Sequence, residues 1–147
     1  MKYKYFTLAV RVAEKVGGRW NKVGTRAIYC SENISLDLLA YYVNSENIAY
    51  LPKIILVAKI QFPDAFVTEE LKEIPKRWNQ YPYSSKTTEI FTDLAKDRNG
   101  FALRVRSTIV GLESNIILNP LYKEFGKVAV IAFIDLLIDE ILKKDIR

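Results

Sequence analysis

Residues 17–24 read GGRWNKVG, and this stretch is the most informative one in the sequence for the fold. Two adjacent glycines let the backbone turn tightly just before Arg19, Trp20 and Asn21. Such a turn can present several hydrogen-bond donors at once. Taken alone, it has two interpretations: a hairpin turn with a solvated arginine and a packed tryptophan, or a loop that contacts a phosphate through Arg19.

Outward from this turn, alternating and β-rich composition predicts strands near residues 6–12, 27–30, 54–61, 101–110, 115–118 and 127–133. Helical spacing predicts a helix over 34–44, with Ser31 or Asn33 as its N-cap, and another over 85–98 that ends at Asn99-Gly100. The first helix has an apolar face made of Leu36, Leu39, Ala40 and Val43.

Two further segments have a less regular pattern of apolar and polar residues. Ile134, Leu137, Ile138, Ile141 and Leu142 fit helical spacing, which favours a strand followed by a helix near the C-terminal end. Residues 68–83, interrupted by two prolines, are predicted to form a surface loop, and the alternative is a cover over a pocket. Without regular βαβ alternation, residues 1–147 are predicted to form a single α+β domain with a largely antiparallel sheet.

Composition removes several classes of site. The chain has 22 basic and 17 acidic residues, and 50% of its residues are hydrophobic, which excludes intrinsic disorder. With no histidine and one cysteine, Cys30, it has no Cys/His zinc site, no Ser-His-Asp triad and no internal disulfide. Neither a Walker-type Gly-Lys-Ser/Thr nor a Gly-x-Gly-x-x-Gly motif is present. No apolar run approaches the roughly 20 residues of a membrane span, and we expect a cytoplasmic protein with Cys30 reduced.

A series of motifs resembles the RES domain in the order in which that family has them. The likeness starts with residues 17–21, GGRWN, and includes the segments Ala27-Ile28-Tyr29, Leu51-Pro52, Ile74-Pro75 with Trp78, LRVRS at 103–107 and ESNIILNP at 113–120. The resemblance implies a fold similar to ADP-ribosyltransferase toxins, and NAD as substrate with no metal. It also implies the toxin of a bacterial toxin–antitoxin pair, neutralised by an Xre-type helix-turn-helix antitoxin. We further expect a homo- or hetero-oligomer that binds neither nucleic acid nor membranes directly.

The resemblance assigns active-site roles to Arg19, Tyr29 and Ser107, with Asn21 completing the NAD-binding set. A planar guanidinium can hold the NAD pyrophosphate at two points, and a tyrosine ring can stack on nicotinamide or adenine. The alternatives are a surface ion pair and a core tyrosine. Strand alternation places Ser107 on the inward face, opposite Arg106, where its hydroxyl contacts either the ribose or a neighbouring carbonyl.

Three departures from the family pattern bear on activity. Arg106 stands where the family usually has proline, and the family's early arginine has only Lys4 and Arg11 as candidates. Ala40 stands where the family has a glutamate, so the catalytic carboxylate is missing. The other site residues remain, which favours a deliberate substitution over natural decay. Asp37, one helical turn earlier, is a shorter partial substitute.

Our hypothesis from the sequence is therefore a toxin that binds NAD and cleaves the nicotinamide–ribose bond, weakened by Ala40. One alternative is a catalytically dead RES-like protein that binds NAD or an antitoxin. Another is an ADP-ribosyltransferase that acts on a protein. A more remote alternative is a single-stranded RNA-binding module, suggested by the combination of nine tyrosines with 22 basic residues.

Overall fold

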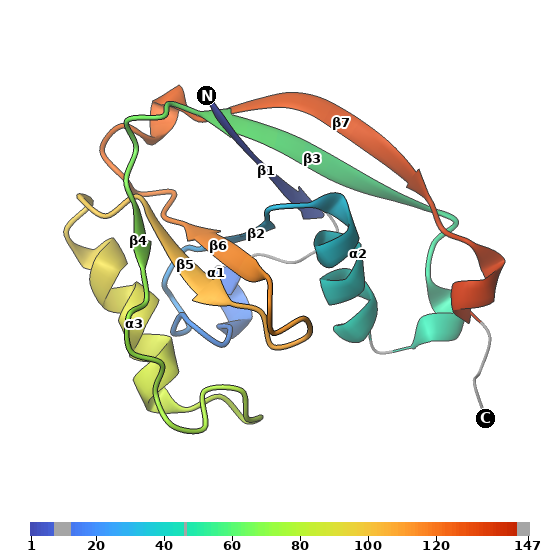
Figure 1. The fold of residues 1–147 in the computed structure, drawn as a ribbon, viewed down its shortest axis with the longest axis horizontal. Helices are drawn as coiled ribbons and strands as arrows, with labels where there is room; N and C mark the ends of the chain where they lie inside the picture. The colour runs from blue at the N-terminus through green and yellow to red at the C-terminus, as the bar shows by residue number, and fades with distance from the viewer. Residues whose placement is uncertain (8–12, 46, 144–147) are drawn as a thin grey trace.

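Seven strands form one mixed sheet in the order β4-β5-β6-β2-β1-β3-β7 (Figure 1). The computed structural model describes residues 1–7, 13–45 and 47–143. The strands are β1 (Lys2–Thr7), β2 (Ile28–Ser31), β3 (Ile54–Phe62), β4 (Thr68–Glu70), β5 (Ala102–Arg106), β6 (Ser114–Leu118) and β7 (Ala129–Leu137). Every described neighbouring pair is antiparallel except β4 with β5. The α+β class with a largely antiparallel sheet is confirmed.

The helices within the described ranges are α1 (Ala13–Val16), α2 (Ile34–Val43) and α3 (Ser85–Lys96), with short 3-10 helices η1 (Ile48–Tyr50), η2 (Phe125–Lys127) and η3 (Glu140–Lys143). Both long helices have side-chain N-caps, and of the two caps predicted for the first helix the structure has Asn33. The amide N–H of Leu36 donates to Asn33 Oδ1 at 2.8 Å, and that of Thr87 donates to Ser84 Oγ at 3.3 Å. None of these helices is long and apolar enough to cross a membrane.

The two long helices pack against different parts of the sheet (Figure 1). Phe91 and Ala95 of α3 pack with Trp20, Leu103 and Ile117. The helix predicted over 85–98 is thus present as α3, with Phe91 and Ala95 on its buried side. Helix α2 lies beside β1 and β2 instead, farther along the sheet from the α3 cluster.

The apolar face predicted for α2 is mostly not in the core. Leu36 is buried, but Leu39 is 37% and Val43 is 57% exposed. Leu38 and Tyr41, from the neighbouring face, pack against Ile55 and Val57 of β3 instead. The face that carries Ala40 and Val43 is therefore turned toward open space beside the sheet.

Two predictions at the ends of elements were wrong. The helix predicted beyond residue 133 is a continuation of β7 to Leu137, followed by η3, because β7 pairs with β3 as far as Ile54↔Leu137. The strand predicted at 6–12 begins at Lys2 instead, and residues 8–12 lie outside the described ranges.

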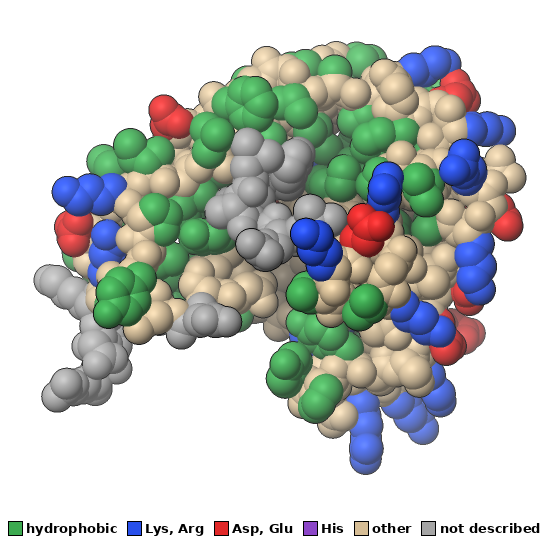
Figure 2. Space-filling model, turned by 180° about the vertical axis from the view of Figure 1, so that it is seen from behind, with side chains coloured by type: hydrophobic (Ala, Val, Ile, Leu, Met, Phe, Trp, Pro, Cys, Tyr) green, Lys and Arg blue, Asp and Glu red, His purple; other side chains and the backbone are tan. Residues whose placement is uncertain are grey.

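Strand β7 is an edge strand with a hydrophobic outer surface. Val130 is 47%, Ile131 44%, Phe133 61% and Leu137 77% exposed. Figure 2 shows hydrophobic side chains gathered over the β3–β7 end of the molecule, whereas Lys and Arg side chains gather on the side that carries α3. The two ends of the sheet thus present surfaces of different chemistry.

Candidate functional site

The turn at residues 17–21 depends on both of its glycines. Gly17 has a φ of +71°, in the left-handed region that favours glycine. The N–H of Gly18 donates to the carbonyl of Asn21 at 3.0 Å. A Cβ on Gly18 would lie 2.6 Å from Tyr29 Oη and 2.8 Å from Asn21 Oδ1, so no larger residue fits without displacing them.

Tyr29 closes the turn from the strand side. Its hydroxyl donates to Asn21 Oδ1 at 2.7 Å and accepts the backbone N–H of Trp20 at 3.1 Å. Burial raises the pKa of the Tyr29 phenol far above its usual range, and this effect outweighs the hydrogen bonds from the Trp20 and Asn21 backbone, which lower it. At neutral pH the phenol is therefore uncharged and holds the turn against β2.

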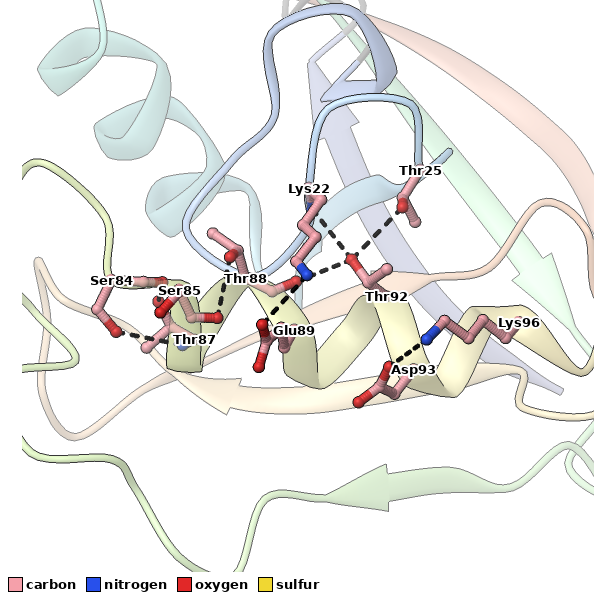
Figure 3. A network of polar contacts seen from close by, with 10 residues as sticks. All are labelled: Lys22, Thr25, Ser84, Ser85, Thr87, Thr88, Glu89, Thr92, Asp93 and Lys96. Atoms are coloured by element: carbon pink, nitrogen blue, oxygen red, sulfur yellow. Dashed lines mark hydrogen bonds and ion pairs between the residues drawn. The ribbon is translucent and has the colours of Figure 1, made fainter.

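The turn is also joined to α3 (Figure 3). The backbone N–H of Lys22 donates to Thr92 Oγ1 at 3.0 Å, and Lys22 Nζ lies 3.1 Å from the Glu89 carboxylate. Thr25 Oγ1 lies 3.4 Å from Thr92 Oγ1. The turn is thus held between a strand and a helix and has a defined position in the fold.

A cavity of about 450 Å³ opens beside this turn. Its lining comes from the end of α1 and the turn, from the end of β2 with α2, and from the end of β5 with the segment after it, and Tyr83 and Asn115 of β6 complete it. Its lining residues are Val16, Gly17, Gly18, Arg19, Trp20, Tyr29, Cys30, Ser31, Asp37, Ala40, Tyr41, Val43, Asn44, Tyr83, Arg106, Thr108, Ile109 and Asn115. Three of the residues singled out in the sequence, Arg19, Tyr29 and Ala40, are among them.

Arg19 joins the cavity to the segment at residues 71–83, which we call the covering loop. Its Nη1 donates to the carbonyls of Trp78 at 2.8 Å and Gln80 at 2.9 Å. Its guanidinium carbon lies 4.8 Å from the centre of the Tyr83 ring. The loop is therefore fastened beside the cavity. Tyr83 is its residue in the described lining, and most of the loop is exposed, as predicted for a surface loop. Strand β4, which the sequence pattern does not predict, precedes the loop.

Ser107 and Asn21 are absent from the lining of this cavity, although Asn21 lines a second cavity that adjoins it. Ser107 is 1% exposed, and its Oγ accepts the backbone N–H groups of Ile109 and Val110, each at 3.1 Å. It fixes the turn that follows β5. Asn21 is fully buried, and its amide donates to the Thr25 carbonyl at 3.1 Å. Both side chains hold backbone turns next to the cavity through hydrogen bonds.

Two further charged residues that the sequence analysis named, Asp37 and Arg106, also line the cavity. Asp37, 6% exposed, places a carboxylate in the wall one turn before Ala40. Strand alternation could have indicated Arg106, since it points away from the inward face of Ser107. Burial, and then the charge of Asp37, raise the pKa of the Cys30 thiol, so this cavity cysteine stays protonated.

Lys4, one of the two candidates for the family's early arginine, is engaged elsewhere. Its Nζ lies 3.6 Å from a Glu32 carboxylate oxygen that Arg104 Nη1 also approaches at 3.1 Å. Lys4 is absent from the cavity lining. Arg11, the other candidate, lies outside the described ranges.

Comparison with known proteins gives a consistent result. The RES domain matches residues 2–139. A protein named Toxin Res from Yersinia enterocolitica serotype O:8 / biotype 1B is 32% identical over 114 residues, which span 77% of this chain and 74% of that protein. Toxin Res from Photorhabdus laumondii subsp. laumondii is 32% identical over 116 residues, 78% of this chain and 74% of that protein. The Prs ADP-ribosylating toxin of Sphingobium sp. (strain YBL2) is 28% identical over 116 residues, 76% and 71% of the two chains.

Proposed function

Because this chain belongs to the RES domain family, we propose that it is the toxin of a bacterial toxin–antitoxin pair and that NAD is its substrate. The bond cleaved is the one between nicotinamide and ribose. One observation supports this proposal most: Arg19, Tyr29 and Ala40, from three separate segments that match family positions, line a single cavity. In this proposal residues 1–147 act as one RES domain.

The reaction needs a site that stabilises a ribosyl cation. Nicotinamide leaves as a neutral molecule with the electron pair of its bond to the ribose carbon, and the sugar becomes oxocarbenium-like. An acceptor then forms a bond to that carbon and gives up a proton. Water as acceptor gives hydrolysis, phosphate gives phosphorolysis, and a protein side chain gives ADP-ribosylation. The name of the Sphingobium relative motivates testing the protein acceptor.

Arg19 is the residue to which we assign the pyrophosphate. A guanidinium has five N–H donors, and the loop carbonyls of Trp78 and Gln80 take those of Nη1. These bonds orient the planar group, whose Nε and Nη2 edge is suited to hold an anion at two points. Tyr29, kept uncharged by burial, supplies an aromatic wall and holds the turn that carries Arg19.

Ala40 supplies no carboxylate, and this determines the expected activity. Loss of one electrostatic contact to the transition state costs on the order of 3 kcal/mol, or roughly a hundredfold in rate. Asp37 lies in the same wall, but its shorter side chain starts one turn away on α2. We therefore expect the chain to bind NAD and turn it over slowly.

The test compares NAD consumption by the chain, Ala40→Glu and Ala40→Gln, with the products identified by mass spectrometry. We expect Ala40→Glu to raise the rate of NAD consumption roughly a hundredfold and to make uninduced expression toxic. Ala40→Gln supplies the shape without the charge and should stay slow. Equal consumption by the chain and Ala40→Glu would contradict a role for the carboxylate.

The same assay decides the second candidate, a catalytically dead protein that only binds NAD or an antitoxin, which Ala40 itself favours. If NAD binds and Ala40→Glu remains inactive, the binding protein is the better description. The antitoxin is tested separately. We expect the product of the adjacent reading frame, an Xre-type helix-turn-helix protein in this proposal, to copurify with the chain and to relieve growth arrest by Ala40→Glu.

A further inference from the structure

A second cavity, of about 340 Å³, adjoins the first at the turn. It shares Val16, Gly17, Gly18 and Tyr83 with the first cavity, so the two are adjoining chambers with a common wall. We propose that this second cavity holds the adenosine half of NAD, with Tyr81 as the platform for the adenine ring. This inference rests on the proposed function.

Size and continuity support a substrate that occupies both chambers. Pockets for drug-sized ligands measure roughly 300–1,000 Å³, and each chamber lies in the lower half of that range. NAD consists of two nucleosides joined by a pyrophosphate, which matches two chambers with a boundary between them. Arg19, whose guanidinium lies against the shared Tyr83 ring, stands at that boundary. The pyrophosphate therefore falls where Arg19 can hold it.

The bond that breaks decides which half of NAD occupies which chamber. The first chamber has the position of Ala40, where the family has its glutamate, and the carboxylate of Asp37, and neither residue lines the second chamber. The described lining of the second chamber has one charged side chain, Lys22, whose ammonium group is paired with Glu89 at 3.1 Å (Figure 3). The nicotinamide ribose, where the bond breaks, therefore falls in the first chamber, and the second chamber takes adenosine.

Tyr81 has the position of a stacking platform. It is 82% exposed, and its ring centre lies 5.4 Å from that of Tyr83 with the ring planes at 88°. Most of the Tyr81 side chain is thus open to solvent in the described structure, while the perpendicular Tyr83 ring lies against Arg19. An exposed aromatic side chain is suited to hold adenine by stacking, because every base has a π face.

The test is calorimetric titration of the full chain with NAD and with nicotinamide mononucleotide, which lacks the adenosine half. Slow turnover keeps both ligands intact during the titration. The variants are Tyr81→Ala, which removes the ring, and Tyr81→Phe, which keeps it. Tyr50→Ala is the matched control, because Tyr50 is 84% exposed and lines neither chamber.

We expect Tyr81→Ala to weaken NAD binding by roughly tenfold, the effect of losing one base–aromatic stacking contact. Nicotinamide mononucleotide should bind to that variant as it does to the parent chain, and Tyr81→Phe and Tyr50→Ala should bind NAD normally. Unchanged NAD affinity in Tyr81→Ala overturns the adenosine assignment alone. An equal loss for both ligands overturns it too, because Tyr81 would then act through Tyr83 and Arg19. If the parent chain binds no NAD, the proposed function fails together with this inference.

Discussion

Gly18 has no space for a side chain, because Tyr29 Oη and Asn21 Oδ1 occupy the place of a Cβ. We predict that Gly18→Ala destabilises the fold by about 1–3 kcal/mol, the usual effect of overpacking a buried site. It should also weaken NAD binding, since the turn carries Arg19. Urea unfolding and calorimetric titration measure the two effects. Gly111→Ala is the control, because a Cβ there meets nothing within 4 Å, and equal stability of the two variants would contradict the prediction.

Single residues differ in how far the sequence indicates their roles. Arg19 and Tyr29 belong to a dense motif, and the resemblance places Ala40 beside them. Ser107 and Asn21 carry polar groups of the right kind, but their side chains bond to backbone groups or to Tyr29 in the walls. Whether a buried hydroxyl faces a ligand or a backbone amide depends on turns that residue spacing does not specify.

Arg19 fastens the covering loop together with the packing of Trp78 on Trp20, and the contribution of Arg19 can be tested at the level of the element. Lysine keeps the charge of Arg19 but cannot reach both the Trp78 and Gln80 carbonyls with a planar group. Losing one such bond lowers the free energy of local opening by about 1.5 kcal/mol or more, which raises the open population roughly tenfold. We predict that trypsin cleaves Arg19→Lys after the exposed Lys76 and Arg77 at least tenfold faster.

A suitable control for this proteolysis is Arg26→Lys. Arg26 is an exposed arginine whose pair with Glu14, at 3.2 Å, lies on the surface. Its substitution should leave the cleavage rate of the loop unchanged. If Arg19→Lys is as resistant as the parent chain, other contacts hold the loop and Arg19 is not its fastening.

Among the elements, α2 and α3 could be predicted because each has a cap and a periodic apolar pattern. Strand β4 could not, since its three residues, Thr-Glu-Glu, have no apolar alternation, and it exists through parallel pairing with β5. The C-terminal pattern fits both periods, and pairing of β7 with β3 favours the strand. Tertiary contacts thus decide the segments whose own pattern is weak or ambiguous.

At the scale of the whole molecule, β7 leaves a hydrophobic edge uncovered. An edge strand presents unpaired N–H and C=O groups, and exposed apolar side chains beside it favour association. We predict that the chain is larger than a monomer in solution, as measured by size-exclusion chromatography with light scattering. Replacing Ile131 and Phe133 together by lysine should lower the mass while leaving NAD affinity unchanged, because neither residue lines either cavity. A monomeric parent chain would contradict this prediction.

Trp20 and Trp78 stack across the joint between the turn and the covering loop, with ring centres 6.2 Å apart, and they are the two tryptophans of the chain. Their location gives the protein an optical reporter that needs no label. Excitation selective for tryptophan yields emission from this joint and from nowhere else in the sequence. A change in fluorescence intensity or wavelength on adding a ligand therefore reports movement or desolvation beside Arg19, while an event confined to the β7 edge leaves the emission unaltered.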